Sequence, residues 1–321
     1  MRNSLAAEVI SQFKAMDRTN LLSVLLLLVL FVFALTARKE KTEEAELSFQ
    51  TVIADSSGDA RELESSLRQV SRGNLLVNAR LAEELGFAVA LVKPLGDSYS
   101  LFEHNVFKQW PLASITKLMT AIVALENINP NQPIAITKDA IAAEGTMGNF
   151  APGEFFALED LVKAMIVTSS NDAAEAIAEF YGRENFVKAM NAKAAQLSMF
   201  DSNFVEPAGL ALSNQSTVFD IEKLVSYIYN RYPRILLFSR LKEVTITDFN
   251  TGIKKHLANI NIFAGNPNFI GGKTGYTDEA NGNLVSLFSS SRENDSRPIL
   301  IVVFGADNRF KATEILWQQY R

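Results

Sequence analysis

Three short motifs carry the residue types that acyl transfer requires, and the first contains a serine and a lysine. Ser114 and Lys117 lie in the segment PLASITKLMT, and a helix that begins near Ser114 would place both side chains on one face. A helix N-terminus favours negative charge developing on a serine oxygen. A lysine with a lowered pKa could accept the serine proton. The spacing therefore predicts a serine nucleophile with a lysine base, although a capping serine beside a surface lysine is the simpler alternative.

The second motif is Ser169-Ser170-Asn171, which separates two stretches with helical periodicity. Serine and asparagine commonly cap helices, so a structural role is one interpretation. If the motif instead faces a cleft, Ser169 would relay a proton to a leaving group and Asn171 would bind a substrate peptide group.

The third motif is Lys273-Thr274-Gly275, within the glycine-rich segment GGKTGYT. A phosphate-binding loop would need a glycine where Pro267 stands, and no strand precedes the segment in a βαβ setting. The alternative is an edge strand beside the nucleophile. There, Lys273 would supply positive potential and Thr274 would bind a substrate carboxylate.

Composition excludes several other kinds of site. The chain has no cysteine and two histidines, His104 and His256, so cysteine nucleophiles, disulfides and histidine-rich zinc sites are not expected. Neither histidine lies in a recognisable catalytic-triad context. The net charge is -5 without a basic block, which argues against nucleic acid as a partner. We expect no metal and no organic cofactor.

Hydropathy divides the chain of 321 residues into an anchor and one domain. Residues 21–37 form an uncharged apolar run at the short end of the length needed for a bilayer span. We predict a transmembrane signal anchor there, with residues 1–20 cytoplasmic; a cleaved signal peptide is the alternative. Residues 38–75 are predicted to form a linker or stalk, and residues 76–321 a compact domain.

Apolar patterning within that domain predicts a mixture of strands and helices. Strands are expected at 87–92, 99–103, 284–288 and 299–304, and helices at 114–127, 158–167, 172–181, 184–197 and 311–320. Strands at both ends with helices between them predict an α+β fold, in which both chain ends contribute to one antiparallel sheet beside a helical cluster.

The motifs, their order and their flanks together resemble the low-molecular-mass penicillin-binding proteins, the serine-type D-alanyl-D-alanine carboxypeptidases. The resemblance extends over residues 87–319. It is carried by PLASITKLMTA (111–121), EDLVKAMIVTSSNDAAEAIAE (159–179), FVEPAGLALSNQST (204–217) and GGKTGYTDEANG (271–282). It implies a β-lactamase/transpeptidase-like catalytic domain that acts on peptidoglycan stem peptides ending in D-alanyl-D-alanine and is acylated by β-lactams. Because peptidoglycan lies outside the cell, it also implies an extracytoplasmic domain.

The same resemblance assigns roles to the motif residues. Ser114 would be the acylated nucleophile, Lys117 its general base and Ser169 the proton relay. Substrate would be bound by Asn171, Lys273, Thr274, Gly275 and Tyr276. Lys273 would also hold down the pKa of Lys117, and the backbone N–H groups of Ser114 and Tyr276 would form the oxyanion hole.

Other activities of such a site stay open at this point. A DD-endopeptidase would use the same nucleophile on cross-linked peptides. A β-lactamase would need a base for deacylation, and Glu206 stands where relatives often carry asparagine. A degenerate cell-wall-binding protein would have lost Ser114, Lys117 or Lys273, and all three are present.

Overall fold

The computed structural model describes residues 78–142, 149–290 and 297–321. Contacts within the chain group residues 74–321 into one compact unit. The predicted membrane anchor at 21–37 and the whole predicted linker at 38–75 lie outside the described residues. Among the helices in the described ranges, none has the length and apolar character needed to cross a membrane.

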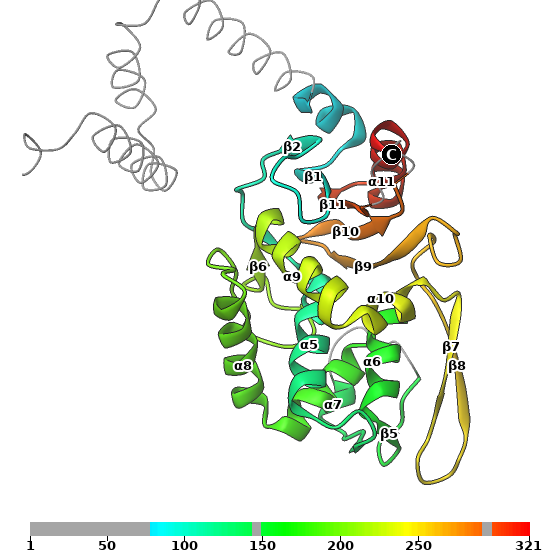
Figure 1. Cartoon of the computed structure of the whole chain (residues 1–321). Helices are drawn as coiled ribbons and strands as arrows, with labels where there is room; N and C mark the ends of the chain where they lie inside the picture. The colour runs from blue at the N-terminus through cyan, green and yellow to red at the C-terminus, as the bar shows by residue number, and fades with distance from the viewer. Residues whose placement is uncertain (1–77, 143–148, 291–296) are drawn as a thin grey trace, which may run out of the picture. The chain divides into compact units, whose positions relative to one another are not determined.

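A five-stranded antiparallel sheet forms the upper part of the domain in Figure 1, with strand order β2-β1-β11-β10-β9. The strands are β1 (Val89–Pro94), β2 (Phe102–His104), β9 (Phe269–Thr277), β10 (Asn281–Phe288) and β11 (Ile299–Ala306). The N-terminal strand β1 pairs with the C-terminal strand β11. The prediction of an α+β fold with one sheet from both chain ends is therefore confirmed.

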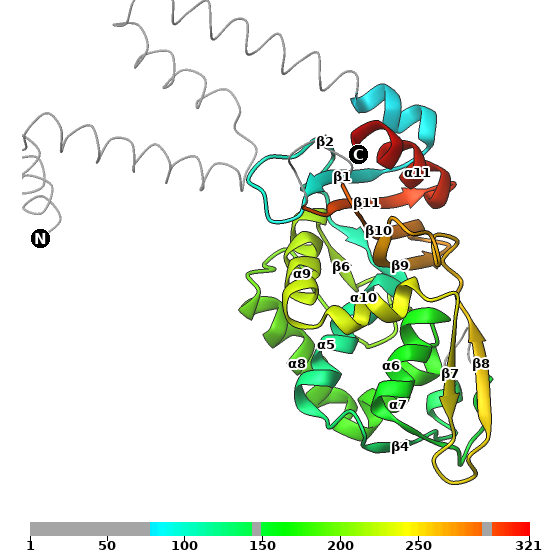
Figure 2. The same ribbon diagram turned by 45° about the vertical axis from the view of Figure 1, so that its right-hand side comes forward.

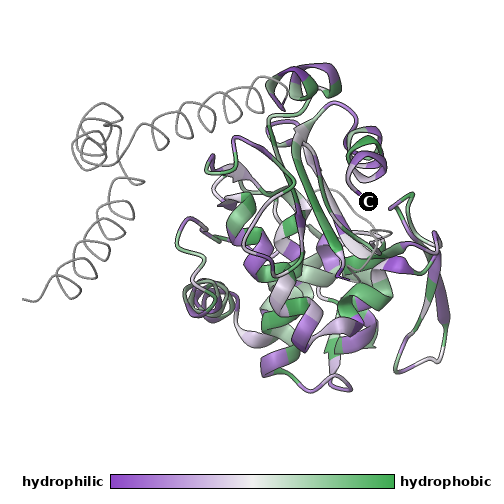
Figure 3. Cartoon of the chain, turned by 45° about the horizontal axis from the view of Figure 1, so that its top comes forward, coloured by the Kyte–Doolittle hydropathy of each residue, from purple (hydrophilic) through white to green (hydrophobic). Residues whose placement is uncertain are grey.

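The central strands are apolar because helices cover both of their faces. Every residue of β1 is buried, and Figure 3 shows the central strands as predominantly apolar. One face packs against the helical segment 78–85 and helix α11 (Arg309–Tyr320), where Phe288 stacks on Trp317 with ring centroids 4.6 Å apart. The opposite face contributes to a larger core with the remaining helices.

The helices of that larger core lie between β1 and β9 in the sequence. They are α5 (Lys117–Asn127), α6 (Leu158–Val167), α7 (Asn171–Tyr181), α8 (Arg183–Gln196), α9 (Val218–Arg231) and α10 (Pro233–Arg240). The predicted helices at 158–167, 172–181 and 184–197 are confirmed to within one residue at each end.

Two features of the helical region were not predicted from the sequence. Helices α9 and α10 were missed, and so was the hairpin of β7 (Glu243–Thr247) and β8 (Lys254–Ala258), which Figure 2 shows beside α6. Short antiparallel pairs also join β3 (Trp110–Pro111) to β6 (Gln215–Ser216) and β4 (Pro133–Ala135) to β5 (Phe155–Ala157).

The predicted helix at 114–127 begins differently from the expectation. Ser114 lies in a 3-10 turn, η1 (Ala113–Thr116), and the α-helix α5 starts at Lys117. Side chains three residues apart are nearly eclipsed in a 3-10 turn. The predicted alignment of Ser114 with Lys117 is therefore kept, although Ser114 does not head an α-helix.

Asn283 on β10 fastens this turn to the sheet. Its side chain is fully buried, and its Nδ2 donates to the carbonyl oxygens of Pro111 at 2.7 Å and Leu112 at 3.1 Å. Its Oδ1 accepts a hydrogen bond from the Gly305 N–H on β11 at 3.0 Å. One amide thus joins two strands to the segment that leads into Ser114.

Replacing this amide should destabilise the domain. Asn283→Ala leaves buried backbone groups at positions 111, 112 and 305 without these partners, and we expect the free energy of unfolding to fall by about 1–3 kcal/mol. Urea unfolding of the purified chain measures the change, with the exposed Asn250→Ala in the β7–β8 turn as the matched control. Equal transition midpoints for Asn283→Ala and wild type would contradict the fastening role.

Candidate active site

The amino group of Lys117 is the centre of the site. The Lys117 side chain is fully buried, and its Nζ donates to Ser114 Oγ at 2.9 Å, Asn171 Oδ1 at 2.7 Å and the Ala208 carbonyl oxygen at 2.5 Å. The partners come from η1, from the start of α7 and from the loop after α8. The structure therefore brings the first two sequence motifs together, and adds Ala208, which the sequence analysis missed.

Burial lowers the pKa of Lys117, so that its amine can act as a base near neutral pH. Desolvation lowers the pKa of Lys117 to about 7, while the charges of Glu206 and Glu175 act in the opposite direction. A large fraction of Lys117 is then unprotonated at neutral pH, in the form that can accept the Ser114 proton. The sequence analysis expected Lys273 to lower this pKa, whereas burial is the largest cause in the structure.

Lys273 brings the third motif to the opposite wall of the site. It is almost fully buried on β9, and its Nζ donates to Ser169 Oγ and to the Thr274 carbonyl oxygen, both at 2.8 Å. Burial and, secondly, the charge of Lys117 lower the pKa of Lys273 well below its ordinary value. Ser169 has a left-handed backbone with φ of 63°. The Lys-Thr-Gly segment is thus an edge strand, as the second interpretation of this motif predicted.

Strand β9 passes directly beside the turn that carries Ser114. A β-carbon placed on Gly275 would lie 3.0 Å from the Leu112 carbonyl oxygen and 3.1 Å from the Ser114 nitrogen. A side chain at this position would push the strand away from Ser114. The neighbours of Gly275 differ in exposure, since Thr274 is buried and Tyr276 is 57% exposed.

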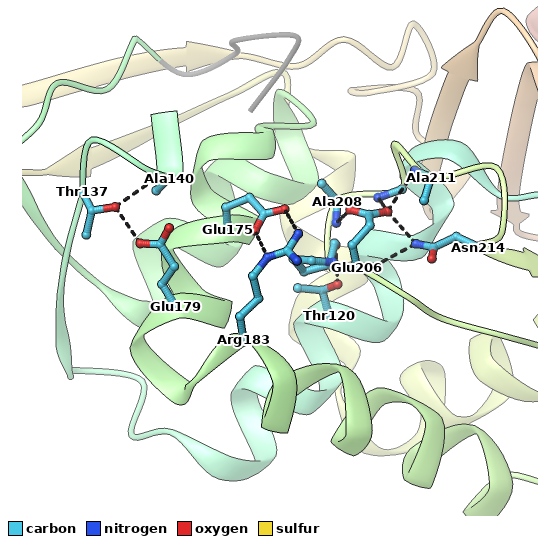
Figure 4. Close-up of polar contacts among 12 residues, drawn as sticks. Thr120, Thr137, Ala140, Glu175, Glu179, Arg183, Glu206, Ala208, Ala211 and Asn214 are labelled. Carbon is cyan, nitrogen blue, oxygen red and sulfur yellow. Dashed lines mark hydrogen bonds and ion pairs between the residues drawn. The ribbon is translucent and has the colours of Figure 1, made fainter. Parts of the chain in front are cut away.

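The loop over residues 206–211, from which the sequence singled out Glu206, contributes to the site through contacts that were not predicted. The Glu206 carboxylate accepts hydrogen bonds from the backbone N–H of Ala208 at 2.7 Å and of Gly209 at 2.6 Å. Asn214 Nδ2 donates to the same carboxylate at 2.7 Å. Figure 4 shows these contacts converging on Glu206. Glu206 thereby shapes the loop whose Ala208 carbonyl group receives Lys117.

A glycine lets the backbone of this loop approach the backbone of Ala113 and Ser114 closely. Gly209 has φ of 89°, and a β-carbon there would lie 1.9 Å from the Ala113 carbonyl oxygen. Thr120 Oγ1 on α5 also donates to the Pro207 carbonyl oxygen at 2.6 Å. The sequence signal for this loop was the segment Glu-Pro-Ala-Gly itself, but its contacts with residues 113–120 are long-range.

Other residue clusters in the described ranges do not resemble a metal site. No group of three or more histidine, aspartate or glutamate side chains there could hold a metal ion. His104 lies on β2 and His256 on β8, and neither belongs to the cluster around Lys117. The chemistry available at this cluster is that of a serine hydroxyl beside a buried amine.

Comparisons with known proteins agree with this geometry. Residues 98–308 match the family described as D-alanyl-D-alanine carboxypeptidase, peptidase family S11. A D-alanyl-D-alanine endopeptidase of Pseudomonas aeruginosa is 33% identical over 72% of this chain and 74% of its own length. The D-alanyl-D-alanine carboxypeptidase DacF of Bacillus subtilis is 31% identical over 71% of this chain, a match that spans 59% of DacF.

A solved structure shares the fold. Penicillin-binding protein D2 of Listeria monocytogenes, determined in its ampicillin-bound form, is 28% identical, with a TM-score of 0.64 over 73% of this chain and 96% of that one. The family match covers well over half of the chain, and the site places a serine hydroxyl on a buried lysine. The chain therefore belongs to the D-alanyl-D-alanine carboxypeptidase family of serine peptidases.

Proposed function

We propose that this protein is a serine D-alanyl-D-alanine carboxypeptidase that acts on peptidoglycan stem peptides. The observation that carries the proposal is the 2.9 Å hydrogen bond between Ser114 Oγ and the fully buried Nζ of Lys117. The family match and the names of the relatives supply the class of substrate.

Acylation begins when unprotonated Lys117 accepts the Ser114 proton and Ser114 Oγ attacks the carbonyl carbon of the penultimate D-alanine. The backbone N–H groups of Ser114 and Tyr276 stabilise the oxyanion. The oxyanion then collapses, the C–N bond breaks, and Ser169 relays the proton that Lys117 took from Ser114 to the departing amine of the terminal D-alanine. Water hydrolyses the resulting ester, which regenerates the Ser114 hydroxyl and releases the shortened peptide.

Substrate binding falls to the residues that face Ser114 from α7 and β9. Asn171 holds a peptide group of the substrate, while Lys273 and Thr274 receive its terminal carboxylate. A carboxylate beside the Lys273 amine favours the ammonium form, so the lowered pKa of Lys273 in the free enzyme is compatible with this role. Gly275 lets the strand run close enough to Ser114 for these contacts.

DD-endopeptidase activity is the second candidate, and the names of relatives favour it. Besides the Pseudomonas protein, a Haemophilus influenzae protein that is 39% identical over 55% of this chain is named D-alanyl-D-alanine endopeptidase. Both reactions break a bond on the carboxyl side of D-alanine at the same nucleophile. Incubation with a pentapeptide and with a cross-linked dimer separates them, since release of D-alanine marks the first activity and release of monomers the second.

Covalent labelling by penicillin should depend on Ser114 and on pH. Ser114→Ala should give no adduct in intact-protein mass spectrometry, whereas the exposed Ser98→Ala should label like wild type. Because Lys117 acts unprotonated and its pKa is about 7, the acylation rate should rise by about tenfold per pH unit below 7 and level off above it. Labelling of the Ser114→Ala variant would contradict the role of Ser114 as nucleophile. An acylation rate that falls as pH rises from 5 to 7 would contradict the role of Lys117 as base.

Glu206 offers a test of the β-lactamase alternative. We assign Glu206 to positioning, because its carboxylate accepts backbone N–H bonds from the loop that holds Lys117. Glu206→Gln replaces one acceptor oxygen with a donor, so acylation by penicillin should slow by about tenfold or more. A base for deacylation would give the opposite result: normal acylation followed by a longer-lived adduct. The exposed carboxylate of Glu243, on β7, provides the matched control Glu243→Gln.

We also propose that residues 21–37 anchor the protein in the cell membrane with the catalytic domain outside, because peptidoglycan lies outside. The support is the uncharged apolar run in the sequence. The full chain should remain in the membrane fraction after a high-salt wash, and a chain starting at residue 47 should not. Protease added to spheroplasts should degrade the anchored domain, and protection of that domain would place it in the cytoplasm.

A further inference from the structure

An ion pair between a buried carboxylate and a half-exposed arginine lies behind the site, and the proposed reaction does not use it. The side chain of Glu175 is 10% exposed and that of Arg183 is 51% exposed. Glu175 on α7 is buried, and its two carboxylate oxygens accept from Arg183, at 2.9 Å from Nε and 3.1 Å from Nη2. This two-pronged geometry is the strongest form of an arginine–carboxylate contact. Figure 4 shows the pair beside the loop that Glu206 organises.

Glu175 lies on the same face of α7 as Asn171, the residue that contacts Lys117. Asn171 and Glu175 are four residues apart, so they share one face of the helix. Asn171 Oδ1 accepts from Lys117 Nζ at 2.7 Å. Glu175 therefore lies one helical turn behind a direct partner of the general base.

A bare carboxylate in this position would oppose catalysis. The charged groups that act on Lys117 are Glu206 in the loop 206–211 and Glu175 on α7, and Lys273 on β9 interacts with Lys117 as a second buried amine. Arg183, at the start of α8, contacts Glu175. Both carboxylates raise the pKa of Lys117 and so favour its protonated form. That form cannot accept the Ser114 proton.

The structure compensates each carboxylate in a different way. Glu206 accepts hydrogen bonds from backbone N–H groups and from the Asn214 amide, which carry no net charge. Glu175 instead faces a guanidinium group that stays charged at every physiological pH. Glu206 and Glu179 also act on Arg183, and its pKa is raised chiefly by the hydrogen bond to Glu175.

We propose that Arg183 is a positioning residue for the Ser114–Lys117 couple: it fixes the Glu175 carboxylate and cancels its charge, so that the buried lysine can work as a base near neutral pH. The inference rests on the proposed role of Lys117 as general base. Arg183 acts on the site through its two hydrogen bonds to the Glu175 carboxylate.

The proposal predicts opposite shifts for the two halves of the pair. Arg183→Met leaves Glu175 uncompensated, so the pKa of Lys117 rises and acylation needs a higher pH. Glu175→Gln removes the negative charge, so the pKa falls and acylation persists at lower pH. The double variant removes both charges, and its pH profile should lie close to that of wild type.

The experiment is the rate of acylation by a fluorescent penicillin between pH 5 and 9, on the full-length chain in detergent. We expect the midpoint of the pH–rate profile to move up by about one pH unit in Arg183→Met, with the acylation rate recovered at pH 9. In Glu175→Gln the same midpoint should move down. Arg234→Met is the matched control, since it breaks the ion pair of Arg234 with Glu159 elsewhere. Its midpoint should not change.

The outcomes separate this inference from the proposed function. Wild type that is not acylated, or whose rate ignores pH, would overturn the role of Lys117 itself. A normal wild-type profile with unshifted midpoints in both variants would overturn only the role of Arg183, because a purely structural ion pair lowers stability without moving the midpoint. If Arg183→Met does not fold, Glu175→Gln still decides the matter, and an upward or absent shift there would refute the proposal.

Discussion

The burial of one amine is the constraint on which the site depends. Lys117 loses all contact with water, and its hydrogen bonds to Ser114, Asn171 and Ala208 replace the lost hydration. Desolvation penalises the ammonium form, which brings the pKa of this lysine to about 7. A surface lysine at the same spacing would stay protonated and could not accept a proton from serine. The fold must therefore enclose Lys117 while leaving Ser114 within reach of substrate.

Three separate parts of the chain build that enclosure around the turn η1. The sheet contacts the segment before η1 through hydrogen bonds from Asn283. Strand β9 lies directly beside η1, because Gly275 has no side chain between the two backbones. Helix α7 presents Asn171, and the loop 206–211 presents the Ala208 carbonyl group. Strand β9 and the loop both approach the backbone of η1 closely, which explains why glycine, rather than a larger residue, stands at positions 209 and 275.

The sequence could reveal the elements with local signatures, and it could not reveal the contacts between distant segments. The helices over 158–197 and the strands near both ends of the domain follow from apolar patterning, and the three motifs identify Ser114, Lys117, Ser169, Asn171 and Lys273 by residue type and spacing. The Ala208 carbonyl lies 91 residues from Lys117 in the chain, and any residue can supply a carbonyl oxygen. Arg183 and Glu175 were missed for a related reason, since they lie on different helices, α8 and α7, and charged residues of helices usually mark a solvated face.

Charge balance links these findings to one another. Burial lowers the pKa of Lys117, and each nearby carboxylate raises it again. A buried amine therefore works best as a base where the nearby negative charges are compensated. The charge of Glu206 is compensated by backbone N–H groups of its own loop, and these hydrogen bonds also shape the loop. The charge of Glu175 on α7 is compensated by the side chain of Arg183 on α8. The pKa of Lys117 therefore depends on the geometry of the loop 206–211 through Glu206, and on the packing of α7 against α8 through Glu175. The pH range of the reaction is then a property of the enclosing structure as much as of the motif residues.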